Sequence, residues 1–267
     1  MTSTMISESR CPVEDGELYV RSTGEGPLLL LIAGGLGSAD TFRAMTKLLA
    51  DDYTVVTYDR RGHFRSSDTS TGPVSVPKQA DDAYAVLQHV GGGPANVFGT
   101  SAGALIGLDL VARHPGAVSV LVAHEPPAVQ LLPDALGWLD EANAQVRLAQ
   151  AGDLMGAFKR FTDGIAGAAL PELRAIRLPN EEDWKRLFGR ELAEILDYLP
   201  DLRALRKAST EIFPVAGVGS RGHYHYQPAK ILALELGLPF TEMPGAHLAP
   251  QRNPAQFTEA LRDLLEA

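Results

Sequence analysis

The stretch that most constrains this chain is VFGTSAGA, residues 97–104, in which an apolar run stops at one serine held between glycines. Gly99 and Gly103 flank Ser101, and small residues continue beyond it in a helical pattern. A serine at the tip of a sharp strand-to-helix turn needs such neighbours, because its backbone is strained and bulky side chains would clash. The G-x-S-x-G pattern therefore predicts a nucleophile at Ser101. A glycine-rich turn that only starts a helix is the alternative.

Strand-like and helix-like segments alternate along most of the chain. Strand candidates lie at 18–21, 28–33, 53–58, 95–98, 118–123, 213–218 and 239–243. Continuous apolar runs such as 28–33 suit a sheet buried on both faces. Helical patterns follow at 39–50, 76–90, 102–114, 227–236 and 254–265. This alternation predicts an α/β fold, with a mostly parallel central sheet flanked by helices and right-handed crossovers.

The middle of the chain has a different pattern. Between about Pro127 and Lys207 we find helical patterns and no convincing strand; the expected helices are 136–149, 153–164 and 181–199. We therefore expect residues 1–126 and 209–267 to form the core domain. Residues 127–208 are expected to form a helical cap inserted between two strands of the sheet.

Composition excludes several classes of protein. The chain has 267 residues and a formal net charge of −9. This charge argues against a protein that binds nucleic acid and against one that binds an anionic membrane surface. The longest apolar run, Pro27–Ala33, is far shorter than the ~20 residues that span a bilayer. The N-terminus MTSTMISESR lacks a signal-peptide pattern, so a cytoplasmic protein is expected. The single cysteine, Cys11, allows no internal disulfide and is expected to be a bystander.

The turn at Ser101 also predicts where an oxyanion could bind. A helix that begins after this serine points free N–H groups and its positive dipole end at the reacting centre, so the N–H of Ala102 is one candidate donor. A second donor is expected from the loop after an earlier strand. That loop is IAGGLGS at 32–38, whose glycines allow close approach to a substrate. The N–H of Leu36 or of Gly35 is the candidate, and a plain flexible turn is the alternative.

Four segments together resemble one enzyme superfamily. LLLLIAGGLGS, YDRRGHFRSS, FGTSAGA and PGAHLAP occur in this order and are similar to the motifs of the α/β-hydrolase superfamily across nearly the whole chain. The likeness implies the α/β-hydrolase fold. YDRRGHFRSS resembles the family segment D-x-R-G-x-G-x-S, with Phe64 in place of a common glycine. That segment is usually structural, which implies structural or salt-bridge roles for Arg60 and Arg61.

The resemblance places the catalytic base after the last strand. A serine hydroxyl needs a base to take its proton, and histidine is suited to this at neutral pH. Of the seven histidines, His247 in MPGAHL has the family position. His223 and His225 alternate with tyrosines in GHYHYQ, and no third ligand lies nearby in the sequence. We therefore expect neither a metal ion nor a cofactor.

The triad acid is absent from its usual position. The family commonly has an aspartate after the strand before the last, but no Asp or Glu occurs between Ile212 and Leu234. Glu125 lies just past the strand at 118–123, at the carboxyl edge where catalytic groups gather. The order Ser101, Glu125, His247 is the expected one. A cap salt bridge is the alternative role for Glu125.

An acid in the context HEPP, residues 124–127, narrows the likeness to α/β-hydrolases of the zearalenone-lactonase type. Those proteins have D-G-L-G in the oxyanion loop and H-E-L-P around the acid, so Gly34 and Pro126 depart from their pattern. Their cap carries a tryptophan over the substrate, which implies such a contact for Trp184. Burial in the cap core is the alternative. Leu248 is also expected to contact the substrate.

The expected function is hydrolysis of an ester or lactone bond in a small organic molecule. It would use a triad of Ser101, His247 and Glu125 and an acyl-enzyme intermediate. Three alternatives stay open: a C–C bond hydrolase, a non-hydrolytic tailoring enzyme of secondary metabolism, and a ligand-binding protein with a vestigial triad. The expected partner is a small-molecule substrate, without nucleic acid or membrane; a homodimer is compatible with the sequence.

Overall fold

The computed structural model describes residues 6–165 and 181–267; residues 1–5 of the expected core and 166–180 of the expected cap lie outside this range. Eight strands form one sheet in the order β1-β2-β4-β3-β5-β6-β7-β8. The pairs β1–β2 and β2–β4 are antiparallel and the other neighbours are parallel. The strands are β1 Ile6–Val13, β2 Gly16–Thr23, β3 Leu28–Ile32, β4 Thr54–Tyr58, β5 Ala95–Thr100, β6 Val118–His124, β7 Glu211–Gly217 and β8 Thr241–Met243.

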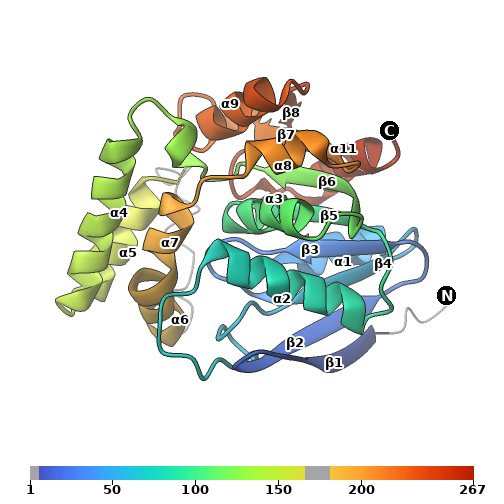
Figure 1. Cartoon of the computed structure of the whole chain (residues 1–267), viewed down its shortest axis with the longest axis horizontal. Coiled ribbons are helices and arrows are strands. Elements are labelled where there is room, and N and C mark those ends of the chain that lie inside the picture. The colour runs from blue at the N-terminus through green and yellow to red at the C-terminus, as the bar shows by residue number, and fades with distance from the viewer. Residues whose placement is uncertain (1–5, 166–180) are drawn as a thin grey trace.

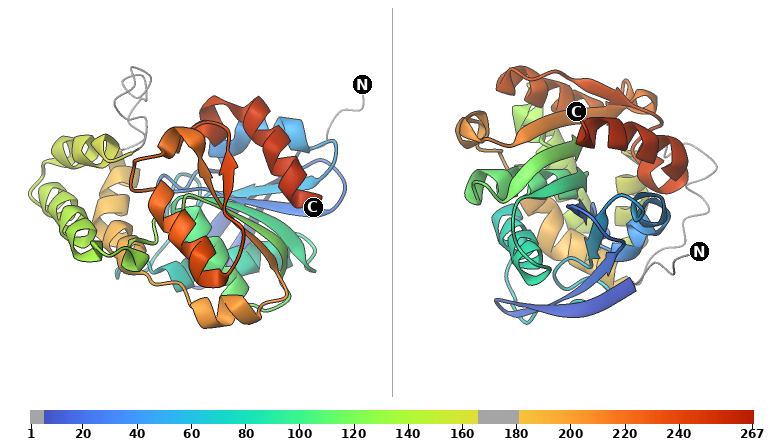
Figure 2. Two further views of the ribbon diagram at one scale, coloured as in Figure 1. Left: turned by 90° about the horizontal axis from the view of Figure 1, so that it is seen from above. Right: turned by 90° about the vertical axis from the view of Figure 1, so that its right-hand side faces the viewer.

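Helices cover both faces of this sheet (Figures 1 and 2). One buried cluster packs α2, α3 and α9 on one face, and a second packs α1 and α11 on the other. The helices of the core are η1 Ala39–Phe42, α1 Arg43–Leu49, α2 Val76–His89, α3 Ala102–Arg113, η5 Val218–Ser220, α9 Tyr226–Leu236, α10 Ala249–Arg252 and α11 Pro254–Leu265. The expected three-layer α/β architecture is therefore confirmed.

Strand β3 explains why the central strands have no polar alternation. Leu30 and Ile32 belong to the cluster with α2 and α3, whereas Leu29 and Leu31 belong to the cluster with α1 and α11. Successive side chains point to opposite faces, so a strand covered on both sides must be apolar throughout. All seven expected strands are present, and their ends differ from the expected ones by no more than two residues.

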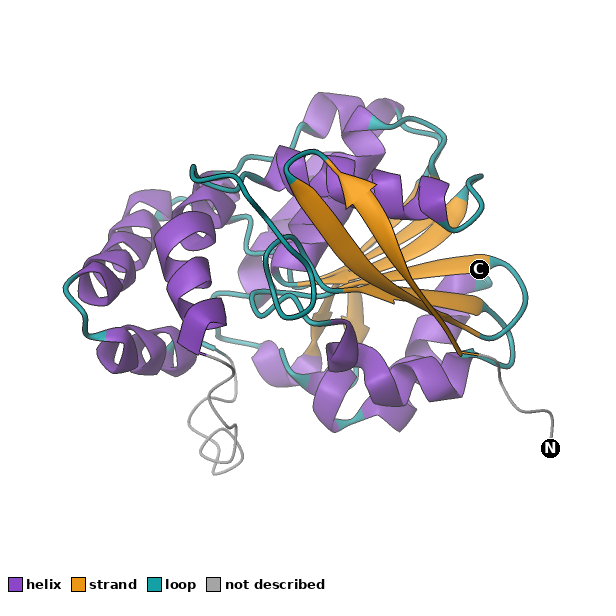
Figure 3. Cartoon of the chain, turned by 90° about the horizontal axis from the view of Figure 1, so that it is seen from below, coloured by secondary structure: helices purple, strands orange, loops and turns teal. Residues whose placement is uncertain are grey.

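A group of helices lies beyond one end of the sheet (Figure 3). Within it, α4 contacts α5 and α7, and α6 contacts α5 and the π-helix η4. The elements between β6 and β7 are η2 Val129–Leu131, α4 Ala135–Gln150, α5 Leu154–Asp163, α6 Glu181–Arg186, η4 Leu187–Glu191, α7 Leu192–Asp197 and α8 Leu202–Lys207. Helix α8, inside the expected cap range, contacts α3 and α9 of the core instead. We call the elements from α4 to α7 the cap helices.

Strand β1 was not expected from the sequence. It is an edge strand paired with β2 from Ile6↔Thr23 to Val13↔Gly16, and most of its side chains are exposed. An exposed edge strand needs no apolar pattern and tolerates a proline such as Pro12. Cys11 is buried within it, and burial raises the pKa of its thiol. In the described ranges, no helix is both long and apolar enough to cross a membrane.

The glycines around Ser101 are required by close approach of the backbone. A Cβ atom on Gly103 would lie 2.1 Å from the carbonyl oxygen of Ile32, and one on Gly99 would lie 2.3 Å from the carbonyl oxygen of Gly103. The start of α3 therefore rests directly on the end of β3, with no room for a side chain between them.

Gly103→Ala should lower the free energy of unfolding by about 1–3 kcal/mol, because a backbone carbonyl cannot yield as a side chain can. Gly137 in α4 is the matched control, since a Cβ there meets nothing within 4 Å. Gly137→Ala should be stabilising by about 0.8–1 kcal/mol. Urea denaturation of both variants tests this, and equal effects would contradict the packing argument.

Candidate active site

Ser101 lies at the turn between β5 and α3 in a strained conformation. Its backbone has φ 55° and ψ −127°, which L-residues rarely adopt. The turn is held from below, where the N–H of Ser101 donates to the carbonyl oxygen of His124 at 2.9 Å. The side chain is partly exposed and lines a cavity. The predicted strand-turn-helix context of the G-x-S-x-G motif is present.

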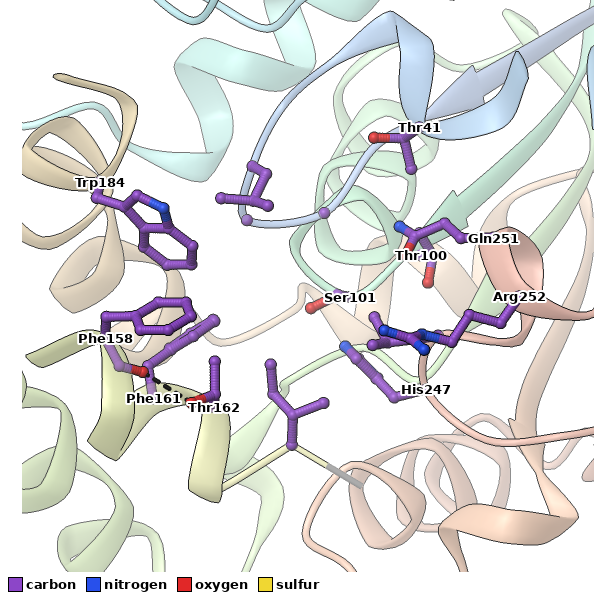
Figure 4. A pocket seen from close by; sticks show the side chains of 15 residues that line it. Thr41, Thr100, Ser101, Phe158, Phe161, Thr162, Trp184, His247, Gln251 and Arg252 are labelled. Atoms are coloured by element: carbon purple, nitrogen blue, oxygen red, sulfur yellow. Dashed lines mark hydrogen bonds between the residues drawn. The ribbon is translucent and has the colours of Figure 1, made fainter. Parts of the chain in front are cut away.

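The structure brings Glu125 and His247 together, although they are far apart in sequence. Glu125 follows β6, and its Oε2 lies 2.7 Å from Nδ1 of His247. Its other oxygen accepts a hydrogen bond from the N–H of Gly217 at 2.8 Å. His247 lies in the loop after β8, and Figure 4 shows its ring directed toward the hydroxyl of Ser101. Ser101 and His247 line the same cavity, and Glu125 lies buried behind the His247 ring.

The electrostatic surroundings keep Glu125 ionised. Burial of this carboxylate raises its pKa, but its interactions with the rings of His124 and His247, including the hydrogen bond from His247, outweigh burial, and the net shift is downward. Glu125 is fully buried, so its charge acts on the neighbouring rings with little screening. An ionised carboxylate at Nδ1 orients the imidazole and stabilises its protonated form.

Glu242, the carboxylate nearest to His247 along the chain, is bound elsewhere. Its carboxylate pairs with Arg221 and accepts a hydrogen bond from the hydroxyl of Tyr226 at 2.8 Å. These contacts lower the pKa of Glu242 to about 2. Its partners therefore come from the segment after η5 and from the first residue of α9, and the carboxylate at the His247 ring is that of Glu125.

Two further histidines surround this pair, and the sequence did not indicate their roles. His225 is 1% exposed, and its ring stacks on that of His247 with 3.9 Å between centroids. Neither ring nitrogen of His225 has a hydrogen-bond partner in the described part of the chain. His124 is fully buried, and its Nδ1 lies 2.9 Å from Oγ1 of Thr100. Over residues 6–165 and 181–267, no group of three or more His, Cys, Asp or Glu side chains is placed to bind a metal ion.

The glycine loop after β3 forms the opposite wall of the cavity. Gly34, Gly35 and Leu36 all line it. A Cβ atom on Gly34 would lie 2.9 Å from Cβ of Ser101, so this backbone passes directly beside the serine. The N–H of Gly37 closes a turn onto the carbonyl oxygen of Gly34 at 3.0 Å. The expected donor loop therefore borders Ser101, and Ala102 is the first residue of α3 on the other side.

The cavity has a volume of about 320 Å³ and a mostly apolar lining. Trp184 and Leu248, the two predicted substrate contacts, both line it. Trp184 packs edge-on against Phe158 with 4.8 Å between ring centroids. Its indole Nε1 is buried and has no hydrogen-bond partner in the described segments.

Sequence reasoning missed several lining residues. Phe158, Phe161, Thr162 and Ile165 line the cavity from α5 and the residues after it. Their spacing of three, four and seven residues places them on one face of a helix, which is a pattern that could have identified them. The remaining lining side chains come from η1, β5 and α10 and have no such signature: Thr41, Thr100, Gln251 and Arg252.

Comparison with known proteins shows similarities over the whole chain. The sequence matches the family model of the α/β-hydrolase fold at residues 27–186. An uncharacterised hydrolase, YraK, of Bacillus subtilis (strain 168) is 35% identical over 98% of this chain and 97% of its own length. A thermophilic esterase from Thermogutta terrifontis has a TM-score of 0.81 at 18% identity, covering 97% of this chain and 98% of that one. An enol-lactonase from Burkholderia xenovorans LB400 has a TM-score of 0.75 at 16% identity, covering 97% and 100%.

The two structural likenesses show the fold alone, because their sequence identities are low. The family match and the bacterial relative carry the assignment, since one covers more than half of this chain and the other nearly all of it. They agree with the order of motifs in the sequence and with the sheet observed here. The chain is therefore a hydrolytic enzyme of the α/β-hydrolase family.

Proposed function

We propose that this protein is a serine hydrolase that cleaves an ester or lactone bond of a small, largely apolar molecule. The observation that carries the proposal is the 2.7 Å contact between Glu125 and Nδ1 of His247, made at the cavity that Ser101 lines. A nucleophile, a base and an orienting acid are the three groups that acyl transfer from a carboxylic ester requires.

In the proposed reaction, the hydroxyl oxygen of Ser101 attacks the acyl carbon while His247 takes its proton. The N–H groups of Ala102 and of Leu36 or Gly35 stabilise the tetrahedral oxyanion. The intermediate collapses as the bond to the leaving alcohol breaks, and His247 returns the proton to that oxygen. Water, deprotonated by His247, then attacks the acyl-enzyme and releases the acid. For a lactone, alcohol and acid leave as one molecule.

The neighbouring histidines support this assignment of the base. Burial lowers the pKa of His124 to about 4 and the pKa of His225 to well below its ordinary value. Both rings are therefore neutral at pH 7 and do not compete for the proton that His247 must carry. Of these three histidines, His247 is the one that forms a hydrogen bond with the Glu125 carboxylate.

The lining supports the substrate class. A cavity of about 320 Å³ accommodates a small organic molecule. Phe158, Phe161, Leu248 and the Trp184 ring line this cavity and favour a substrate with an apolar body. The esterase and the enol-lactonase among the structural neighbours are compatible with this substrate class.

Ser101→Ala and His247→Ala should each abolish turnover of p-nitrophenyl esters without loss of folding, because the reaction has no other nucleophile or base. Reaction with a fluorophosphonate probe, followed by intact mass, tests the first variant directly. A Ser101→Ala protein that still hydrolyses esters near the wild-type rate would refute the proposal, and a wild-type protein inert to esters and probe would favour a binding role.

Glu125→Gln should reduce kcat on the order of 10³–10⁴-fold, because the amide keeps the shape but cannot stabilise a protonated His247. Glu242→Gln is the matched control, since it removes a carboxylate that contacts Arg221 and Tyr226 instead. The control should keep wild-type kcat. A dominant loss in Glu242→Gln would reverse the assignment of the acid.

Stability should fall as the pH is lowered through the range of unfolded histidine, about pH 6.5. Unfolded imidazoles bind protons there, whereas the buried rings of His124 and His225 resist protonation because their pKa values are lowered. The unfolded state therefore binds more protons, and each ring contributes a slope approaching about 1.4 kcal/mol per pH unit. In urea titrations at several pH values, His225→Phe should make the free energy of unfolding less dependent on pH by one such contribution. Substitution of the exposed His89 by Gln should leave that pH dependence unchanged.

A further inference from the structure

One buried arginine holds the back of the loop that borders Ser101. Arg60, which is 1% exposed, donates from Nε to the carbonyl oxygen of Gly34 at 3.1 Å. Its Nη2 donates to the carbonyl oxygen of Gly35 at 3.0 Å. The planar guanidinium thus fixes two successive peptide groups at once, which a single donor could not do.

Peptide geometry relates these carbonyls to the proposed oxyanion donors. In a trans peptide the C=O and the following N–H point in opposite directions. The carbonyl of Gly34 shares its peptide with the N–H of Gly35, and the carbonyl of Gly35 shares its peptide with the N–H of Leu36. With both carbonyls turned toward Arg60, both N–H groups point away from it. The loop's other side is the cavity side, where Gly34 passes beside Ser101.

The far end of the same guanidinium is bound by the cap helices. Nη1 of Arg60 donates to Oε2 of Glu191 at 2.9 Å, 131 residues away along the chain. Glu191 is the last residue of the π-helix η4, and π-helical turns are rare and concentrated at functional sites. The carboxylate also contacts Nε2 of His63 at 2.9 Å and Nε of Arg186 at 3.0 Å.

We propose that Arg60 is a positioning residue for the oxyanion hole and that Glu191 fixes Arg60, so that the docked cap determines the orientation of the Gly35 and Leu36 N–H groups. This inference rests on the proposed function, because it assigns those groups to the oxyanion. It adds two residues that touch neither the substrate nor the triad. It also assigns a chemical consequence to the contact between the cap and the core.

Charge makes the contact specific. Burial raises the pKa of Glu191, but its interactions with the His63 ring and with the guanidinium groups of Arg60 and Arg186 outweigh burial and the net shift is downward, so the carboxylate is ionised. An ionised carboxylate in a buried site strongly constrains its donors, since leaving any of them unpaired is costly. Arg60 therefore has little freedom to release the loop while the cap helices are in place.

The adjacent residue is a matched control. Arg61 is 2% exposed, comes from the same segment, and also binds a carboxylate, with Nε donating to Oδ2 of Asp82 at 2.8 Å. Its other contacts are to the carbonyl oxygen of Glu14 at 2.5 Å and to Asp68. These partners belong to α2, the β1–β2 turn and the segment after β4. Arg61 thus resembles Arg60 in burial and charge, but its contacts lie away from the glycine loop.

The test compares Arg60→Lys with Arg61→Lys in the full chain. Lysine keeps the charge but cannot bridge two carbonyls and a carboxylate as the planar fork does. Arg60→Lys should lower kcat for p-nitrophenyl butyrate by about 10- to 100-fold, since losing one oxyanion donor outright costs about 10²–10³. The inhibition constant of an alkyl boronic acid, which forms a tetrahedral serine adduct, should rise in parallel while KM changes little. Arg61→Lys should lower the melting temperature and leave kcat and the boronic acid affinity near wild type.

Glu191→Gln provides a second, gentler variant, because it keeps the side-chain shape and removes the charge that holds Arg60. It should shift kcat and boronic acid affinity in the same direction as Arg60→Lys, and it decides the question if Arg60→Lys does not fold. The inference is overturned if Arg60→Lys loses no more kcat than Arg61→Lys, or if Glu191→Gln leaves both readouts unchanged. If the wild-type protein itself neither hydrolyses esters nor binds the boronic acid, the proposed function fails instead.

Discussion

The rest of the site depends on the contact between the start of α3 and the end of β3. Ser101 is held at φ 55°, a conformation that costs about 1–3 kcal/mol and persists only where the surroundings impose it. They impose it through Gly103, which touches the carbonyl of Ile32, and through the bond from the Ser101 N–H to His124. Because the serine cannot relax into an ordinary helical start, its hydroxyl is held out toward the cavity and its backbone beside the glycine loop.

Strand pairing places the acid by the same means. In the β5–β6 ladder, Thr100 is opposite His124, so the next residues, Ser101 and Glu125, leave the sheet side by side at its carboxyl edge. Glu125 also has a positive φ, of 49°. Two adjacent strands are thus each followed by a strained residue of the proposed triad. This register explains how an acid after β6 can reach His247, while the segment after β7 has no carboxylate and contributes the N–H of Gly217.

How much the sequence could reveal follows from the range of the interactions. Local patterns identified the central strands and the turn at Ser101, since burial on two faces and a tight turn both restrict residue types nearby in the chain. Glu125 was predicted as the acid because the segment between Ile212 and Leu234 contains no carboxylate, and the structure has its contact with His247. Strand β1 had no apolar pattern to detect. The contacts of Glu191 with Arg60 and of His225 with His247 depend on how elements far apart in the chain pack together. Short sequence patterns do not predict such packing.

Buried charge at the junction of cap and core needs a reason other than stability. Removing ions from water costs several kcal/mol each, and a buried pair often stabilises a fold no better than apolar residues would. Yet the side chains of Glu191, Asp68 and Asp183 are all buried here among basic side chains. An apolar contact could slide, whereas these carboxylates accept only donors in fixed positions, as when Asp68 pairs with Arg186 at 2.6 Å. The carbonyls of Gly34 and Gly35 need buried donors in any case, and a cation can serve both them and a carboxylate of the cap. Holding the glycine loop beside Ser101 in one orientation is a geometric requirement, and it favours directional, charged contacts over apolar ones.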